Sequence, residues 1–147
     1  MKQTSPMEVG IPVIDVDKMY AFYTEVLSCK ETRRADIAVE LSQGLTTSAN
    51  GYLNIWLQTP GGEVIKLMSP PDAPSLNPAP EQLSMRTGIA YLTFYCSDLA
   101  ATLAAAEERG AVLRSDRALI GEDQHPLRLC FFADAEGNII ELVELNS

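Results

Sequence analysis

The pattern of hydrophobic and polar positions repeats once along the chain. In each half, alternating apolar residues typical of strands surround one segment with the three- and four-residue spacing of an amphipathic helix. In the first half, a strand, a helix and three strands are expected at residues 9–14, 18–27, 30–39, 52–58 and 63–69. In the second half, the same order is expected at residues 88–96, 99–109, 111–120, 127–133 and 138–145. The pattern therefore predicts an internal duplication.

The duplication is clearest at the last strand of each half. Gly61–Leu67 returns as Glu136–Leu142, and in both copies the last glycine is followed four residues later by a charged residue between aliphatic neighbours. These charged residues are Lys66 and Glu141. A charge in an apolar strand is costly to bury unless it is paired or functional. Both residues are therefore candidates for a functional site.

A proline-rich stretch separates the two halves. Residues 69–80 contain five prolines, which excludes a helix or a central strand there. We expect one domain (1–147) made of module 1 (about 7–69), a linker (70–86) and module 2 (87–147). The loop near 45–51 is expected to hold the extra length of the first module. Because one helix covers only one face of a sheet, two such modules should pack to close a core or a cavity.

Composition excludes several classes of partner. The net charge is −9 and no basic stripe is present, so neither nucleic acid nor an anionic membrane is expected. No apolar run approaches the roughly 20 residues of a spanning helix, and the N-terminus lacks the apolar segment of a signal peptide. The three cysteines, Cys29, Cys96 and Cys130, are far apart. This spacing favours buried thiols in a reducing cytoplasm over a zinc site or a disulfide framework.

Several motifs resemble the vicinal oxygen chelate superfamily, which includes glyoxalase I, extradiol dioxygenases, methylmalonyl-CoA epimerase, and the bleomycin and fosfomycin resistance proteins. They are Asp15, Phe22–Tyr23, Val26–Leu27, Asp134–Asn138 and Ile140–Leu142. The resemblance spans about residues 8–144. It implies an α+β fold in which two tandem βαβββ modules curl into an open, barrel-like cavity, often across a dimer. We therefore expect a small-molecule substrate and a homodimer.

The resemblance also implies four positions at the cavity floor, where metal-dependent members bind a divalent ion. The first-strand position, commonly His, is Glu8 in module 1 and Tyr91 in module 2, each seven residues before a helix-capping Asp. The last-strand position, commonly Glu, is Lys66 in module 1 and Glu141 in module 2. A protonated Lys has no lone pair to offer a cation. We therefore expect no cofactor; if a divalent metal binds, Glu8 and Glu141 are the ligands.

These four residues suggest a metal-independent enzyme. Lys66, held between Glu8 and Glu141, could stabilise an enolate in place of the metal. One carboxylate would then move a proton next to a carbonyl while Tyr91 donates a hydrogen bond to the same oxygen. This chemistry is that of an isomerase, an epimerase or a lyase. One alternative is a non-catalytic protein that sequesters a ligand, as bleomycin resistance proteins do, with Lys66 merely neutralising the carboxylates; another is a divalent-metal glyoxalase or dioxygenase.

Strand alternation predicts further side chains in the cavity. The aliphatic residues of the segment 52–58 should pack under the helix, leaving its aromatic and amide residues on the other face. The expected substrate-binding residues are Tyr52, Asn54, Trp56, Met68, Thr93, Tyr95 and the loop residue His125. The pair Arg33–Arg34 either binds an anionic tail of the substrate or forms a solvated strand edge.

Overall fold

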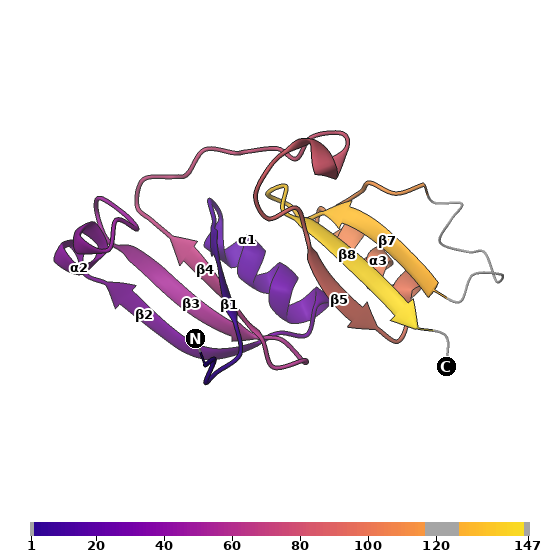
Figure 1. Ribbon diagram of the computed structural model, residues 1–147, viewed down its shortest axis with the longest axis horizontal. Coiled ribbons are helices and arrows are strands. Elements are labelled where there is room, and N and C mark those ends of the chain that lie inside the picture. Colours follow the sequence, from indigo (N-terminus) through magenta and orange to yellow (C-terminus); the bar gives the residue numbers. More distant parts are fainter. Residues whose placement is uncertain (1, 117–126, 146–147) are drawn as a thin grey trace. The chain divides into compact units, whose positions relative to one another are not determined.

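Two four-stranded mixed sheets organise the protein in the computed structural model, which describes residues 2–116 and 127–145. The chain divides into two units, 1–75 and 76–147. Strand order is β1-β4-β3-β2 in unit 1 and β5-β8-β7-β6 in unit 2. In each sheet the first pair is parallel and the remaining pairs are antiparallel. The predicted α+β class with two βαβββ modules is thus confirmed (Figure 1).

Unit 1 matches most of the expected elements. Its strands are β1 (Glu8–Pro12), β2 (Lys30–Ile37), β3 (Tyr52–Gln58) and β4 (Val64–Ser69). Its helices are α1 (Val16–Ala21), the π-helical turn η1 (Phe22–Val26) and α2 (Val39–Gly44). Asp15 caps α1, since its carboxylate accepts a hydrogen bond from the backbone N–H of Lys18 at 3.0 Å.

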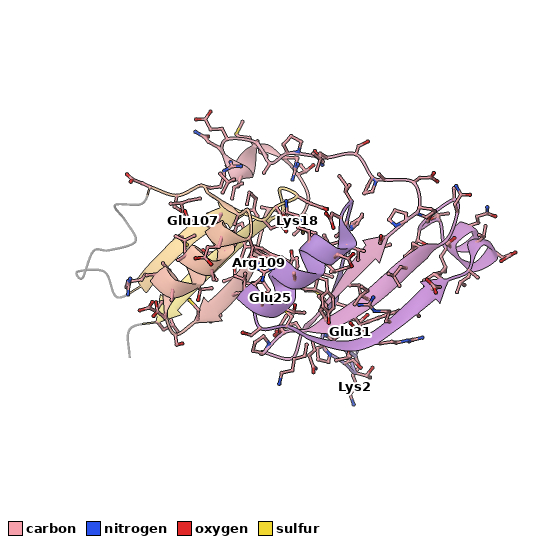
Figure 2. All side chains as sticks on the ribbon, turned by 180° about the vertical axis from the view of Figure 1, so that it is seen from behind. Lys2, Lys18, Glu25, Glu31, Glu107 and Arg109 are labelled. Atoms are coloured by element: carbon pink, nitrogen blue, oxygen red, sulfur yellow. The ribbon has the colours of Figure 1, made fainter. Side chains whose placement is uncertain are left out.

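The helical segment α1–η1 lies against one face of the unit 1 sheet (Figure 1). Its fully buried side chains are Met19, Phe22 and Tyr23, and the sheet residues buried with them are Ile55, Leu57, Ile65 and Leu67. The aliphatic side of β3 therefore packs under the helix, as the alternation predicted. The continuous α-helix expected at 18–27 is wrong in detail, because its second half is π-helical. Figure 2 shows the opposite side of the molecule, where Glu31 of β2 is labelled.

Helix α2 was not expected from the sequence. It lies directly before the loop that we assigned to the extra length of module 1, and its N-cap residue Ala38 makes no side-chain cap hydrogen bond. The buried Ser42 ties this segment together: its hydroxyl donates to the carbonyl of Val39 at 2.9 Å and accepts from the N–H of Gly51 at 3.1 Å.

Unit 2 repeats the plan of unit 1. Its elements are η2 (Leu83–Met85), β5 (Leu92–Cys96), α3 (Leu99–Glu108), β6 (Val112–Leu113), β7 (Leu127–Ala133) and β8 (Ile139–Leu145). Asp98 caps α3 through the N–H of Ala101 at 2.9 Å. Glu144 of β8 also accepts from the first N–H of this helix, that of Leu99, at 2.6 Å and pairs with Arg128 at 2.8 Å. The last strand therefore anchors the start of the helix that covers it.

Two strands of unit 2 are shorter than expected. The strand predicted at 88–96 begins only at Leu92, and Gly88 has φ +107°, a conformation that an extended strand does not use. The strand predicted at 111–120 is limited, within the described residues, to Val112–Leu113. Beyond it, the N–H groups of Arg114 and Ser115 both donate to the carbonyl of Phe131, which ends the regular ladder.

The remaining segments are irregular or short. Residues 70–82 contain neither helix nor strand, as the proline content required. In the described part of the chain, every helix is too short or too polar to cross a membrane. The single-domain boundaries, the cytoplasmic location and the homodimer stay predictions.

Candidate functional site

The strand pairings define one face of the unit 1 sheet, opposite to α1, which we call open face 1. Directly paired residues point to the same side of a sheet, so its members can be assigned from the register. They are Glu8, Gly10 and Pro12 of β1, Val64, Lys66 and Met68 of β4, Tyr52, Asn54, Trp56 and Gln58 of β3, and Lys30, Arg33, Ala35 and Ile37 of β2. Every residue of module 1 that we predicted as catalytic or as one of the substrate-binding residues of β3 and β4 lies on this face.

An ion pair lies at one side of open face 1. The Nζ of Lys66 is 2.9 Å from Oε2 of Glu8, and the two side chains are 31% and 41% exposed. Lys66 lies opposite Gly10 in the parallel ladder, two positions beyond Glu8. Gly10 offers no side chain, and a Cβ there would lie 3.1 Å from Sδ of Met68. The ammonium group therefore reaches along β1 to the carboxylate of Glu8.

A stacked pair of side chains lies next to this ion pair. Trp56 is paired with Lys66 on one side and with Arg33 on the other. The guanidinium carbon of Arg33 lies 4.6 Å from the centroid of the Trp56 ring, within the range of a cation–π contact. One row across the sheet thus holds an ammonium, an indole and a guanidinium.

Arg34 belongs to a different environment from that of Arg33. It is paired with Ile55 and so lies on the helix-covered side, where it binds Glu31 through two hydrogen bonds of 2.9 and 3.0 Å. The hydrogen bond from Arg34 lowers the pKa of the Glu31 carboxyl, and the hydrogen bond between Glu31 and Tyr20 raises the pKa of that tyrosine. A β-bulge between Glu31 and Arg33 produces this separation. The sequence suggested the pair Arg33–Arg34 as one possible anion site, but it could not show that only Arg33 lies on open face 1, because the bulge shifts the alternation.

The corresponding face of the unit 2 sheet, open face 2, carries a carboxylate. The pairings place Thr93 and Phe131 on either side of Glu141, and the Thr93 hydroxyl donates to Oε2 of Glu141 at 2.6 Å. Tyr91 precedes β5 and packs edge-to-face on Phe131, with ring centroids 5.1 Å apart. Tyr95 lies further along the same side of β5 and is 71% exposed.

The predicted residues therefore fall into two groups. The residues Glu8, Tyr52, Asn54, Trp56, Lys66 and Met68 lie on open face 1, and Tyr91, Thr93, Tyr95 and Glu141 lie on or beside open face 2. His125 lies outside the described residues. Asn54 is the most enclosed of the polar residues on open face 1, with 3% of its surface exposed.

The donor set of each face does not fit a divalent metal ion by itself. Each face carries one of the two predicted carboxylate ligands: that of Glu8 is paired with the ammonium of Lys66, and that of Glu141 accepts from Thr93. Within residues 2–116 and 127–145, no three His, Cys, Asp or Glu side chains cluster in a way that could hold a metal ion. Hard divalent ions require more oxygen ligands than one carboxylate provides.

Comparison with solved structures shows the same fold over the whole chain. A glyoxalase family protein from Bacillus cereus is 21% identical, with 100% of this chain and 97% of that chain covered and a TM-score of 0.82. The fosfomycin resistance protein FosX from Listeria monocytogenes, complexed with Mn(II) and sulfate, is 13% identical over 99% of this chain and 94% of that chain, with a TM-score of 0.60. A V278E mutant of glyoxalase I from Zea mays is 15% identical over 95% of this chain but only 44% of that chain, with a TM-score of 0.68.

The two comparisons by sequence gave different results. No curated protein matches the chain significantly. The family described as the glyoxalase/bleomycin resistance protein/dioxygenase superfamily matches residues 6–142, which cover module 1 from its first strand and most of module 2. The chain therefore belongs to the glyoxalase/bleomycin resistance protein/dioxygenase superfamily.

Proposed function

We propose that the protein catalyses proton transfer next to the carbonyl group of a small molecule, with Lys66 supplying the positive charge that a metal ion supplies in metal-dependent relatives. The observation that carries this proposal is the pair between Nζ of Lys66 and Oε2 of Glu8 at 2.9 Å, on a half-exposed sheet face. An ammonium group at this strand position can stabilise an enolate oxygen. The reaction is that of an isomerase, an epimerase or a lyase.

The proton balance of the step is simple. A carboxylate removes a proton from the carbon next to the carbonyl, and the electron pair of the broken C–H bond moves to the carbonyl oxygen. The resulting enolate accepts a hydrogen bond from the ammonium group of Lys66, and return of a proton to the opposite face of the same carbon completes an epimerisation. Glu8 and Glu141 are the two candidates for the base, and Tyr91 is the candidate for a second donor to the oxygen.

The first experiment follows this exchange without knowledge of the true substrate. Wild-type protein is incubated in D2O with a panel of small α-hydroxy ketones and α-keto acids, and NMR measures the incorporation of deuterium next to the carbonyl. Lys66→Met should lower the exchange rate by about 100-fold, the loss typical of removing one electrostatic stabiliser. The matched control is Lys30→Met, which removes a lysine from β2 on the same face. Equal rates in the Lys66 variant, the control and wild type would refute the proposal.

Two further variants identify the base. Glu8→Gln and Glu141→Gln each replace a carboxylate by an amide of the same shape. The variant that lacks the base should turn over about 100-fold or more slowly than wild type, because general base catalysis contributes roughly 10²–10⁴-fold. Its affinity for the ligand should stay within about twofold of wild type. If neither variant lowers turnover, neither carboxylate is the base.

Sequestration of a ligand without catalysis is the second candidate function. It is favoured by the exposed aromatic side chains of open face 2, where Tyr91 and Tyr95 are 43% and 71% exposed. The ligand affinity of a sequestering protein should fall in proportion to the contact area that a substitution removes, so Tyr95→Ala and Trp56→Leu would weaken binding. Glu141→Gln would have no effect on turnover, because such a protein catalyses no reaction. Isothermal titration against the ligand that binds best in the panel measures this difference.

A divalent-metal enzyme is the remaining alternative. Lys66→Glu places a carboxylate at the position that is commonly a ligand in the family, beside the carboxylate of Glu8. Binding of Mn²⁺ by this variant but not by wild type would support the assignment of the position. Stoichiometric Mn²⁺ in wild-type protein would instead favour the metal-dependent chemistry.

A further inference from the structure

Open face 1 differs in charge from the rest of this acidic chain. Among the strand residues of β1–β4, all of which the structure describes, the register places Lys30, Arg33 and Lys66 on this face together with one carboxylate, Glu8. The acidic residues of β2, Glu31 and Asp36, are paired with Leu57 and Leu53 and so lie on the helix-covered side. The face therefore has an excess of positive charge, while the whole protein carries −9. A local excess of this kind concentrates anions at the surface.

Arg33 contributes to this excess without a carboxylate of its own. Four other arginines bind acceptors within their own unit: Arg34 binds Glu31, Arg128 binds Glu144, Arg86 binds the carbonyls of Asn77 and Pro78, and Arg114 binds those of Pro80 and Glu81. Arg33 instead lies over Trp56, and in the described residues no carboxylate bonds to it. Its hydrogen-bonding capacity is available to a ligand.

The stacking on Trp56 also prepares Arg33 for this role. A guanidinium over an aromatic face keeps its N–H groups at the edge of the plane, where they can bind a carboxylate or a phosphate through two parallel hydrogen bonds. The indole holds the planar group at 4.6 Å and so restricts its orientation. Less rotational freedom is then lost when an anion binds.

The distance between Arg33 and Lys66 limits the size of the ligand. The two residues lie in the same row, separated by one strand, because both are paired with Trp56. Neighbouring strands lie about 4.8 Å apart, so the two Cα atoms are roughly 10 Å apart. The lean of Arg33 over Trp56 brings its guanidinium nearer to Lys66. This spacing suits a short ligand whose anionic group and carbonyl oxygen are a few bonds apart.

We propose that the substrate carries a carboxylate or phosphate group, and that Arg33, stacked on Trp56, binds this group while Lys66 binds the reacting oxygen. The substrate class is thus a small carbonyl compound with a terminal anionic group. This inference rests on the proposed function for the role of Lys66, but the binding of the anion by Arg33 can be tested independently.

The chain contains its own reporter for this test. Trp56 is its single tryptophan, so tryptophan fluorescence reports on the surroundings of this one side chain, which include Arg33. Four probes are titrated at constant ionic strength: succinate and acetate for the carboxylate source, and 3-phosphonopropionate and inorganic phosphate for the phosphate source. Titration calorimetry measures affinity in parallel, because a change at Arg33 also changes the starting fluorescence. Succinate and 3-phosphonopropionate each carry two anionic groups, and acetate and inorganic phosphate are their counterparts with one. Wild type should bind at least one of the two-anion probes about tenfold or more tightly than its counterpart. The two-anion probe that binds more tightly shows whether a carboxylate or a phosphate is preferred.

Three variants separate the possible causes. Arg33→Gln should weaken binding of the preferred two-anion probe about tenfold, as expected for the loss of one charge-assisted hydrogen-bonded group. Arg34→Gln removes the same charge from the neighbouring position on the other side of the sheet and should change affinity by less than about twofold. Arg33→Lys keeps the charge without the two-pronged geometry and should fall between them. Thermal melts of all three verify folding, which is expected because both arginines are exposed.

The outcomes are distinct for the two proposals. Equal losses in Arg33→Gln and Arg34→Gln would indicate general charge only and overturn the inference, as would unchanged affinity in Arg33→Gln or no binding of the two-anion probes by wild type. None of these results depends on turnover. If Lys66→Met leaves carbonyl exchange intact while Arg33→Gln abolishes tight binding, the proposed reaction fails and the anion site stands.

Discussion

The turn before β8 is held by one carboxylate, and its removal should destabilise the protein measurably. Asp134 is only 3% exposed. Its Oδ1 accepts from the backbone N–H groups of Glu136 at 3.0 Å and Asn138 at 2.9 Å, and its Oδ2 accepts from Nδ2 of Asn138 at 2.9 Å. Because this turn leads directly into the strand that carries Glu141, its stability also fixes the candidate site of unit 2.

The expected loss can be estimated from these contacts. A hydrogen bond to a charged acceptor contributes roughly 1.5–3 kcal/mol, but residues 136–138, which carry the donors, are only partly buried, so water can replace part of what is lost. Asp134→Ala should therefore cost about 3 kcal/mol, less than the sum of three such bonds. Asp134→Asn keeps one oxygen for the two backbone donors but opposes its NH2 group to that of Asn138. It should cost about 1–1.5 kcal/mol.

Two measurements test this estimate. Urea denaturation followed by circular dichroism gives the free energy of unfolding, and the melting temperature of Asp134→Ala should fall by roughly 6–12 °C for a protein of this size. Amide hydrogen exchange adds a local readout, because the N–H groups of Glu136 and Asn138 should lose protection first. The matched control is Glu108→Ala, which removes an exposed carboxylate of the same unit. A loss for Asp134→Ala within 1 kcal/mol of this control would refute the reasoning.

Two further predictions concern ionisable groups. Burial raises the pKa of the Cys29 thiol to about 12, so at pH 8 only about one molecule in 10⁴ carries the thiolate. Mass spectrometry should therefore find Cys29 unmodified by iodoacetamide in native protein and modified in urea. Rapid labelling of the native protein would contradict the burial of this thiol. The Thr59 hydroxyl, 2.6 Å from Oε2 of Glu63, lowers the pKa of that carboxyl. This interaction stabilises the fold above the ordinary Glu pKa of about 4.3 and is lost as the pH falls through the lowered value. Thr59→Val should therefore reduce stability more at pH 7 than at pH 3 in urea titrations, and equal losses at both pH values would contradict the assignment.

The sequence predicted the elements whose patterns are strong and missed those set by local backbone geometry. β3 and β7 have the predicted bounds, because each is a run of seven residues rich in apolar and aromatic side chains. Helix α2 was missed, since six residues without a capping side chain give little periodic signal. β5 begins later than predicted, because the positive φ of Gly88 interrupts the extended chain. Glycine often adopts a positive φ, but the sequence does not show which of the glycines does so.

The same limit applies to the candidate site. The alternation of β3 and β4 was sufficient to place Trp56 and Lys66 on one face, which the pairings bear out. It could not place Arg33, because the bulge after Glu31 inserts one residue and reverses the alternation for the rest of β2. A bulge depends on the partner strand, so its position is not encoded in the spacing of β2 alone.

The duplication explains how one strand position can carry opposite charges. Glu141 lies opposite Thr93, whose hydroxyl satisfies the carboxylate directly, whereas Lys66 lies opposite Gly10, which has no side chain. Neutralisation of Lys66 therefore depends on Glu8, two residues away on the same neighbouring strand. A change of charge at this position needs a matching change on the first strand. Lys66→Glu has no matching change on the first strand, so its new carboxylate would lie near that of Glu8 with no positive charge between them. The variant should therefore be less stable than wild type unless a bound cation relieves the repulsion. Stabilisation of this variant by Mn²⁺, absent in Lys66→Met, would show that the position retains the geometry of a metal ligand.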